Sequence, residues 1–398
     1  VRLTRKNIIA ISAAAAALVV IIAGLIISNS SNKSDMFTPI VEFHNEAFPV
    51  KIIATATAET AFDGSPRMIE TNNYIGDVIG DFGAKLDGAF SDCDVRIEIE
   101  SDRFIKKSQI ETRLKSNNDV EIFPRINYNY VELGKLKQPL VENITFKLFV
   151  NNKLKKETAQ TVTFHSLNEV PFLEVSRHDN ETLNSYHYMF AAMVNEDHPL
   201  IDTILREALQ SGAINHILGA KYNVFAGYQD IDENGDREYE VISQVFAVWY
   251  VLQSHNIRYS NITRTSTESE YIATQYVRSI EESFANTQSN CVDGSVLFAS
   301  ILRKIGIDTF LVIIPGHMLA GFYIDENHKT PFFIETTMLG NEDITKYGKK
   351  RGVEVSLDLF FDALKSGNET VANTDKDDFI IIDIAQCRKA GIRPVRRE

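Results

Sequence analysis

A long apolar segment near the start of the chain, residues 8–27, constrains the possible folds more than any other feature of the sequence. Its twenty residues carry no charge, and as an α-helix they would rise about 30 Å, enough to cross the hydrocarbon core of a bilayer. Residues 1–6 hold three basic side chains whereas 28–34 hold one, so the positive-inside rule puts the N-terminus in the cytoplasm. We therefore predict a cytoplasmic basic flank at 1–6, a transmembrane anchor in the lipid bilayer at 7–28 and a linker at 29–37. The rest of the chain would be periplasmic or extracellular.

A cleaved signal peptide is the alternative interpretation of this segment. The apolar region of a signal peptide is about 7–15 residues long and is followed by a small-x-small cleavage site. The apolar run here is longer, and it ends in Leu25, Ile26 and Ile27, which make a poor cleavage site. We therefore expect an uncleaved anchor and a single-pass membrane protein.

The composition of the 398-residue chain is that of a packed globular protein, and it excludes several classes. Lys and Arg number 41 against 54 Asp and Glu, a net charge of −13. This balance disfavours a nucleic-acid partner, because phosphate contacts need a basic surface. Three cysteines are too few for a disulfide framework, and neither CxxC nor HExxH occurs, so no structural zinc site or zincin is expected.

Residues 38–170 alternate apolar and polar side chains with a period of two, which predicts β-strands. The clearest runs are at 50–58, 95–100, 144–150 and 154–164. Asn151 and Asn152 separate the last two runs, which is typical of a hairpin. Short strands with turn residues between them predict a β-sandwich domain of immunoglobulin-like size at 38–170. We find no catalytic set of residues there, and we expect a spacer or a binding module.

From about residue 171 the spacing of apolar residues becomes that of amphipathic helices. One helix is expected at 198–209 and another at 243–253. Trp249 lies on the apolar face of the second, where a large ring is expected to pack in the core.

An acidic stretch between these two helices matches the first half of an EF-hand loop. The oxygen-bearing side chains at its alternate positions are Asp230, Asp232, Asn234 and Asp236. Position 12 of such a loop would be Val241 instead of the bidentate Glu. We therefore interpret the stretch as an acidic turn, with a weak calcium site as the alternative.

The segment around Cys291 has the signature of a helix start. Asn290 can cap the helix, Asp293 lies in its first turn and Gly306 can end it. Cys291 would therefore lie at the helix N-terminus, where unpaired N–H groups and the helix dipole favour a thiolate. Because the charge of Asp293 acts in the opposite direction, the thiol still needs an imidazole partner.

Two strand-like segments follow this helix and carry the remaining parts of a thiol triad. His317 begins the second of the strands that follow residue 309, and Glu335 directly follows a run at 332–334. If the strands that carry His317 and precede Glu335 pair as a hairpin, the two side chains come together. We predict that Cys291 attacks, His317 takes and returns the proton, and Glu335 orients the ring and stabilises its charged form.

Several short stretches share this arrangement with a known family. They are Gln275 to Phe284, Asn290-Cys291-Val292-Asp293-Gly294, Gly316-His317 and Ile334-Glu335-Thr336-Thr337. Over roughly residues 180–340 the chain resembles the transglutaminase-like family, whose papain-like domain has Cys at a helix N-terminus and His and Asp on adjacent strands. The resemblance implies a papain-like α+β catalytic domain at 171–398, with Glu335 in place of the commoner Asp.

The resemblance also implies two donors for the oxyanion of the tetrahedral intermediate. One is the backbone N–H of Cys291, and the other is a side chain upstream, for which Gln275 is the candidate. No metal or cofactor is expected, because the mechanism does not require one.

We therefore expect an anchored thiol enzyme that acts on an amide of a protein or peptide through a thioester. If water resolves the thioester, the protein is a hydrolase or peptidase, and the resemblance favours this outcome. If a lysine amine resolves it, the protein is a cross-linking transferase. A catalytically silent cell-surface binding or assembly module is the third possibility, since a fold alone never establishes activity.

The other two cysteines are expected to be unreactive. Cys93 lies among acidic residues that disfavour a thiolate, and Cys387 has no base in a matching position. A disulfide between them is conceivable outside the cell.

Overall fold

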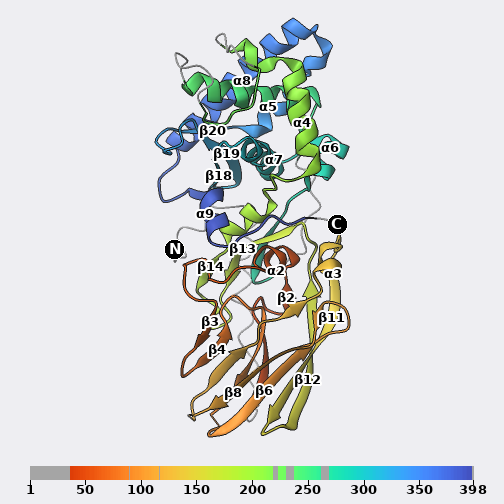
Figure 1. The fold of residues 1–398 in the computed structure, drawn as a ribbon, viewed down its shortest axis with the longest axis vertical. Coiled ribbons are helices and arrows are strands. Elements are labelled where there is room, and N and C mark those ends of the chain that lie inside the picture. The colour runs from red at the N-terminus through yellow and green to blue at the C-terminus, as the bar shows by residue number, and fades with distance from the viewer. Residues whose placement is uncertain are drawn as a thin grey trace.

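The computed structural model describes residues 36–396 except 89, 116, 218–222, 230–236 and 261–268. The anchor predicted at 7–28 lies outside the described residues. Within the described ranges, no helix is long and apolar enough to cross a membrane. These ranges form a mixed α+β structure with several sheets, strand-rich at one end and helix-rich at the other (Figure 1).

Two five-stranded sheets make up most of the strand-rich end. In spatial order the first contains β1 (Phe37–Val41), β5 (Phe82–Leu86), β9 (Val120–Phe123), β4 (Tyr74–Asp77) and β3 (Met68–Glu70). The second contains β2 (Glu46–Ala47), β12 (Lys153–Phe164), β11 (Leu140–Val150), β6 (Cys93–Glu100) and β8 (Ser108–Leu114). Buried side chains of both sheets, such as Phe82 and Phe146, belong to one core. A short pair of strands, β7 (Ile105–Lys106) and β10 (Asn127–Tyr128), and helix α3 (Tyr130–Gly134) complete this end.

The predicted strands at 95–100 and 144–150 are confirmed as parts of β6 and β11. The predicted hairpin is also confirmed, because β11 and β12 pair antiparallel on either side of Asn151 and Asn152. Both residues have positive φ, 48° and 62°. Two left-handed residues in a row make the turn whose twist matches that of paired strands, and Asn tolerates this conformation.

The strand predicted at 50–58 is wrong, because α2 (Pro49–Ala54) is a helix that begins at a proline. Val50 and Ala54, four residues apart, face a cluster built with the C-terminal half of the chain. Ile52 lies on the other face and belongs to the core of the two sheets. Because the helix is buried on both faces, its apolar residues alternate in sequence as those of a strand do.

A three-stranded sheet lies between the two ends of the molecule (Figure 1). It contains β14 (Leu183–Ser185), β13 (Glu169–Val175) and β16 (Ile272–Tyr276), and η2 (His187–Met193) follows β14. The buried cluster at this level combines Phe43 and Val50 from the N-terminal part with Phe190 and Val296 from the C-terminal part.

The predicted helices at 198–209 and 243–253 are confirmed as α4 (Pro199–Ser211) and α5 (Arg237–Ser254). His198 caps α4 by accepting a hydrogen bond from the backbone N–H of Leu200. Trp249 is fully buried, as expected. The other helices of this end are η3 (Ala213–His216), α6 (Ile280–Asn286), α7 (Cys291–Lys304), η4 (Thr336–Gly340), η5 (Ile344–Lys346), α8 (Lys349–Ala372) and α9 (Ile384–Lys389).

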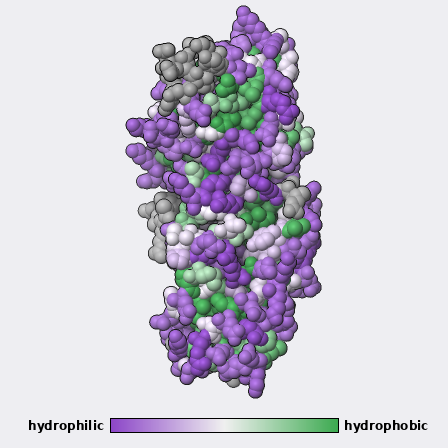
Figure 2. Space-filling model, viewed as in Figure 1, coloured by the Kyte–Doolittle hydropathy of each residue, from purple (hydrophilic) through white to green (hydrophobic). Residues whose placement is uncertain are grey.

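A four-stranded antiparallel sheet supports the helices. Its order is β20 (Pro331–Ile334), β19 (His317–Tyr323), β18 (Thr309–Ile314) and β21 (Ile380–Asp383). Helix α7 lies beside β18 and β19 (Figure 1). Its Leu297 and Ile301 share a core with Phe322. A short parallel pair, β15 (Arg258–Tyr259) and β17 (Gln288–Ser289), leads into the start of α7. The face of the molecule in Figure 2 is largely hydrophilic, which fits apolar side chains gathered inside these cores.

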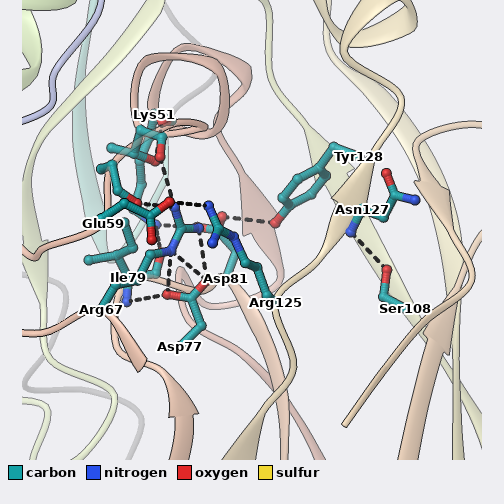
Figure 3. A network of polar contacts seen from close by, with 12 residues as sticks. Lys51, Glu59, Arg67, Asp77, Ile79, Asp81, Ser108, Arg125, Asn127 and Tyr128 are labelled. Atoms are coloured by element: carbon teal, nitrogen blue, oxygen red, sulfur yellow. Dashed lines mark hydrogen bonds and ion pairs between the residues drawn. The ribbon is translucent and has the colours of Figure 1, made fainter. Parts of the chain in front are cut away.

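A buried ionic network fixes α2 to the strand-rich end (Figure 3). Lys51 donates to Asp81 Oδ1 at 2.6 Å and to the carbonyl of Ile79 at 2.9 Å. Tyr128 donates to the other oxygen of Asp81 at 3.0 Å. The side chains of Lys51 and Asp81 are only 7% and 4% exposed, so neither charge can be solvated if its partner is lost.

We predict that Lys51→Ala lowers the free energy of unfolding of the full chain by about 3 kcal/mol, because it leaves the buried charge of Asp81 uncompensated. The measurement is equilibrium urea denaturation followed by fluorescence. Lys85 and Asp119 provide the matched control, since they pair at 3.0 Å with side chains 48% and 57% exposed. Lys85→Ala should leave stability unchanged, and equal losses in the two variants would contradict the prediction.

Candidate active site

Helix α7 begins at Cys291, as predicted. The side chain of Asn290 accepts a hydrogen bond from the N–H of Asp293 at 2.9 Å, and the carboxylate of Asp293 accepts one from the N–H of Asn290 at 2.9 Å. This reciprocal capping box fixes where the helix starts. The helix ends at Lys304, close before Gly306, whose φ of 81° suits glycine. Cys291 is half-buried at the N-terminus.

The strand pairing explains why His317 and Glu335 meet. β19 and β20 are antiparallel neighbours in which Ala320 lies opposite Ile334, so the register places Glu335 opposite Leu319. His317 is two residues from Leu319 and therefore on the same face of the sheet. A diagonal pair of long side chains at this separation lies within reach of a hydrogen bond.

The three side chains that the sequence singled out lie together, and two of them are joined by a hydrogen bond. His317 Nε2 and Glu335 Oε2 are 2.7 Å apart. The side chain of Cys291 lies near enough to the ring to contribute to its raised pKa. The second oxygen of Glu335 accepts from the N–H of Thr337 at 3.1 Å and from its hydroxyl at 2.6 Å. The carboxylate is thus held from both sides, and it orients the ring toward the sulfur.

The electrostatics of this chain favour a protonated ring. Burial acts to lower the pKa of His317, but hydrogen bonds to Cys291 and Glu335 outweigh it and raise the pKa to about 10. Burial acts to raise the pKa of Glu335, but hydrogen bonds from His317 and Thr337 hold it below its ordinary value. A protonated ring beside the sulfur favours its ionised, nucleophilic form.

Close packing joins the start of α7 to the segment that carries Glu335. A Cβ added at Gly294 would lie 2.9 Å from Oγ1 and 3.2 Å from Cβ of the buried Thr336. The hydroxyl of Ser295, also buried, lies 3.4 Å from the hydroxyl of Thr336 and 3.4 Å from the carbonyl of Met318. One turn of α7 therefore contacts the residue after Glu335 and the residue after His317.

The other cysteines are buried in the structure. Burial raises the pKa of Cys93, with the charge of Asp94 adding to it, and burial raises the pKa of Cys387 to about 12. Both are free, so the conceivable disulfide between them is not formed. Cys291 differs from both in its half-exposed position and its imidazole partner.

Two further predictions receive no support from the geometry. The amide of Gln275 donates to the carbonyl of Tyr276 at 2.8 Å, and no hydrogen bond described for the chain joins it to Cys291. Its role as an oxyanion donor therefore stays a prediction. The calcium candidates Asp230, Asp232, Asn234 and Asp236 lie outside the described residues. Among the residues that are described, no group of three or more His, Cys, Asp or Glu side chains could hold a metal ion.

Sequence reasoning missed one residue that bonds to the first turn of α7. Arg278 Nη1 lies 2.6 Å from Asp293 Oδ2, and the two side chains are buried. Spacing gives no signal for this pair, because β17 and α6 separate the two residues along the chain.

Comparison with protein-family models, curated proteins and solved structures finds no match to this chain. The assignment of the site therefore rests on its own geometry and on the chemistry of its side chains.

We predict that Gly294→Ala slows alkylation of Cys291 at pH 7 by about tenfold, because the added methyl group pushes α7 away from Thr336 and the sulfur away from His317. The measurement is the iodoacetamide rate on the Cys291 peptide, read by mass spectrometry, with thermal unfolding to check the fold. Gly348→Ala is the control, since a Cβ there meets nothing within 4 Å. An unchanged rate in Gly294→Ala would show that the close approach does not position the sulfur.

We predict that the ring of His317 titrates near pH 10, far above the ordinary value of about 6.5. Glu335→Gln and Cys291→Ser should each lower this midpoint, since each removes a group that stabilises the protonated ring. Histidine-selective NMR on the full chain measures it, with His317→Gln to assign the signal.

The same shift predicts a pH window for stability. The folded-state pKa of His317 is above the unfolded value, so the stabilisation is complete below about pH 6.5 and is lost as the pH rises through about 10. The stability difference between wild type and His317→Gln should shrink across this window. An NMR titration midpoint for His317 at or below pH 6.5 would refute the raised pKa and the contacts with Cys291 and Glu335 that cause it.

Proposed function

We propose that the chain is a membrane-anchored, extracytoplasmic thiol enzyme of transglutaminase-like type. One observation carries the proposal: the ring of His317 is hydrogen-bonded to Glu335, and the neighbouring side chain of Cys291 contributes to its raised pKa. A nucleophile, a base and a group that orients the base are the parts that acyl transfer through a covalent intermediate needs.

The architecture supports the same proposal. We propose that the two five-stranded sheets that share one core are an immunoglobulin-like sandwich, and that the helix-rich end is a papain-like catalytic unit. Helix α7 carries the nucleophile at its N-terminus, and β19 and the end of β20 bring the other two groups against it. This order is the one expected from the resemblance.

The proposed reaction begins with attack of the Cys291 thiolate on the carbonyl carbon of an amide. A sulfur–carbon bond forms, and the oxyanion is stabilised by the N–H of Cys291 and, in our proposal, by the amide of Gln275. The carbon–nitrogen bond then breaks as protonated His317 gives its proton to the leaving amine. Water attacks the resulting thioester as the ring of His317 takes up its proton, and a carbon–oxygen bond forms. The carbon–sulfur bond then breaks, which releases the carboxylic acid and returns the thiolate of Cys291 beside the protonated ring.

The charge state of the ring suits this sequence of steps. A pKa of about 10 keeps His317 protonated at neutral pH, when it must act first as an acid toward the leaving amine. Glu335 remains ionised, because its pKa is held below the ordinary value, and it compensates the charge of the ring. The proposal therefore starts from a protonated ring beside the sulfur, with an ionised Glu335 on the other side.

Hydrolysis is the outcome that we propose for the thioester, with a protein or peptide as the substrate and residues after about 29 outside the cytoplasm. The uncharged segment 8–27 with its basic flank supports this location. An amine in place of water would give a cross-linked product by the same first step.

We predict that an electrophilic peptide library labels the full-length protein at Cys291, that Cys291→Ser abolishes this labelling, and that His317→Ala slows it at least about a hundredfold. Cys387→Ser is the matched control, because this buried thiol has no imidazole partner, and it should leave labelling unchanged. Equal labelling of all three cysteines in the wild type would reject the enzyme and favour a binding module.

A second arm of the experiment distinguishes water from an amine as the acceptor of the acyl group. A peptide that contains glutamine and lysine is supplied with and without a fluorescent primary amine, and the products are identified by mass spectrometry. Hydrolysis gives the same products in both samples. A fluorescent peptide adduct that is absent in Cys291→Ser would instead establish the transferase.

A further inference from the structure

The first turn of α7 contains a buried negative charge close to the nucleophile. Asp293 follows Cys291 by two residues, and only 1% of its surface is exposed. A helix N-terminus attracts negative charge, so the thiolate of Cys291 and the carboxylate of Asp293 depend on the same dipole. Taken alone, the charge of Asp293 would disfavour ionisation of the thiol.

Arg278 meets this carboxylate with two groups. Its backbone N–H lies 2.8 Å from Asp293 Oδ1, and its Nη1 lies 2.6 Å from Oδ2. The side chains of the two residues are 9% and 0% exposed, so little water screens the pair. The N–H of Asn290 completes the set of donors at 2.9 Å.

The position of Arg278 connects two parts of the candidate site. It follows β16, the strand that carries Gln275, and precedes α6. Through its two bonds to Asp293, the end of this strand is fixed against the first turn of α7. The capping box does not itself need the charge, because an amide oxygen at position 293 can accept the same hydrogen bond from Asn290.

We propose that Arg278 is a positioning residue for Cys291: its guanidinium compensates the charge of Asp293 and fixes the first turn of α7, which keeps the thiol of Cys291 reactive beside His317. The inference deepens the proposed function and rests on it. In the part of the chain that the structure describes, the charged groups of this environment include His317 from β19, Glu335 at the end of β20, Asp293 on α7 and Arg278 from the segment before α6. His198 and Glu281 line the same pocket as Arg278.

The test is the rate at which iodoacetamide alkylates Cys291 in the full chain, measured by mass spectrometry between pH 5 and pH 10. Arg278→Gln should slow alkylation at pH 7 about tenfold and move the midpoint of the pH profile upward, because a negative charge is left uncompensated. Arg278→Lys, which keeps the charge, should recover most of the rate.

The decisive variant is Asp293→Asn, which removes the opposing charge. Its amide oxygen can accept from Asn290 and from Arg278 Nη1, while its amide nitrogen takes the place of the oxygen that accepts from the backbone N–H of Arg278. Cys291 in this variant should be alkylated at least as fast as in the wild type. Combining Asp293→Asn with Arg278→Gln should restore the alkylation rate to within about threefold of the wild-type rate. A merely structural role predicts instead that both single variants slow alkylation and that the double variant is slower still. That result, or an unchanged rate in Arg278→Gln, would overturn the inference.

Folding is checked by circular dichroism and thermal unfolding of each variant. If Arg278→Gln fails to fold, Asp293→Asn alone decides: a rate equal to or above wild type supports the charge argument, and a slower rate overturns it. Failure of the proposed function gives a different result. Cys291 would then be alkylated no faster in the wild type than in His317→Ala.

Discussion

The candidate site depends on how closely the first turn of α7 approaches Thr336. A side chain larger than hydrogen at position 294 would overlap with this buried residue, so the helix can lie as near as it does only because the residue is glycine. Thr336 directly follows Glu335, so this approach holds the start of α7, with Cys291, against the segment that carries Glu335. The proposed triad would tolerate little displacement of Cys291 from His317, because proton transfer occurs only within hydrogen-bond reach.

The charged side chains of the site are paired with opposite charges. Glu335 is hydrogen-bonded to His317, and Arg278 is bonded to Asp293 in the first turn of α7. Each buried charge therefore has an opposite neighbour, which removes the large penalty for burying a charge alone. Such an arrangement can hold reactive ionic forms in a largely dry environment, and it makes each member sensitive to the loss of its partner.

Local patterns predicted a large part of the structure. The hairpin at Asn151 and Asn152, the start of the helix at Cys291 and the pairing of the strands beside His317 and Glu335 each depend on neighbouring residues and their conformational preferences. Helix α2 was mistaken for a strand, since burial on both faces hides its period. The bond from Arg278 to Asp293 and the packing of Gly294 arise from tertiary contacts, and neither leaves a periodic trace in the sequence.

Helix α2 limits how the molecule can be divided. Its Ile52 belongs to the core of the two five-stranded sheets, whereas Val50 and Ala54 complete the apolar cluster beneath η2 and α7. A truncation that begins near residue 171 would delete the contribution of α2 and leave part of that cluster open to water. The strand-rich end therefore contributes to the core of the helix-rich end. A chimera that replaces the strand-rich end with another domain would have to retain α2.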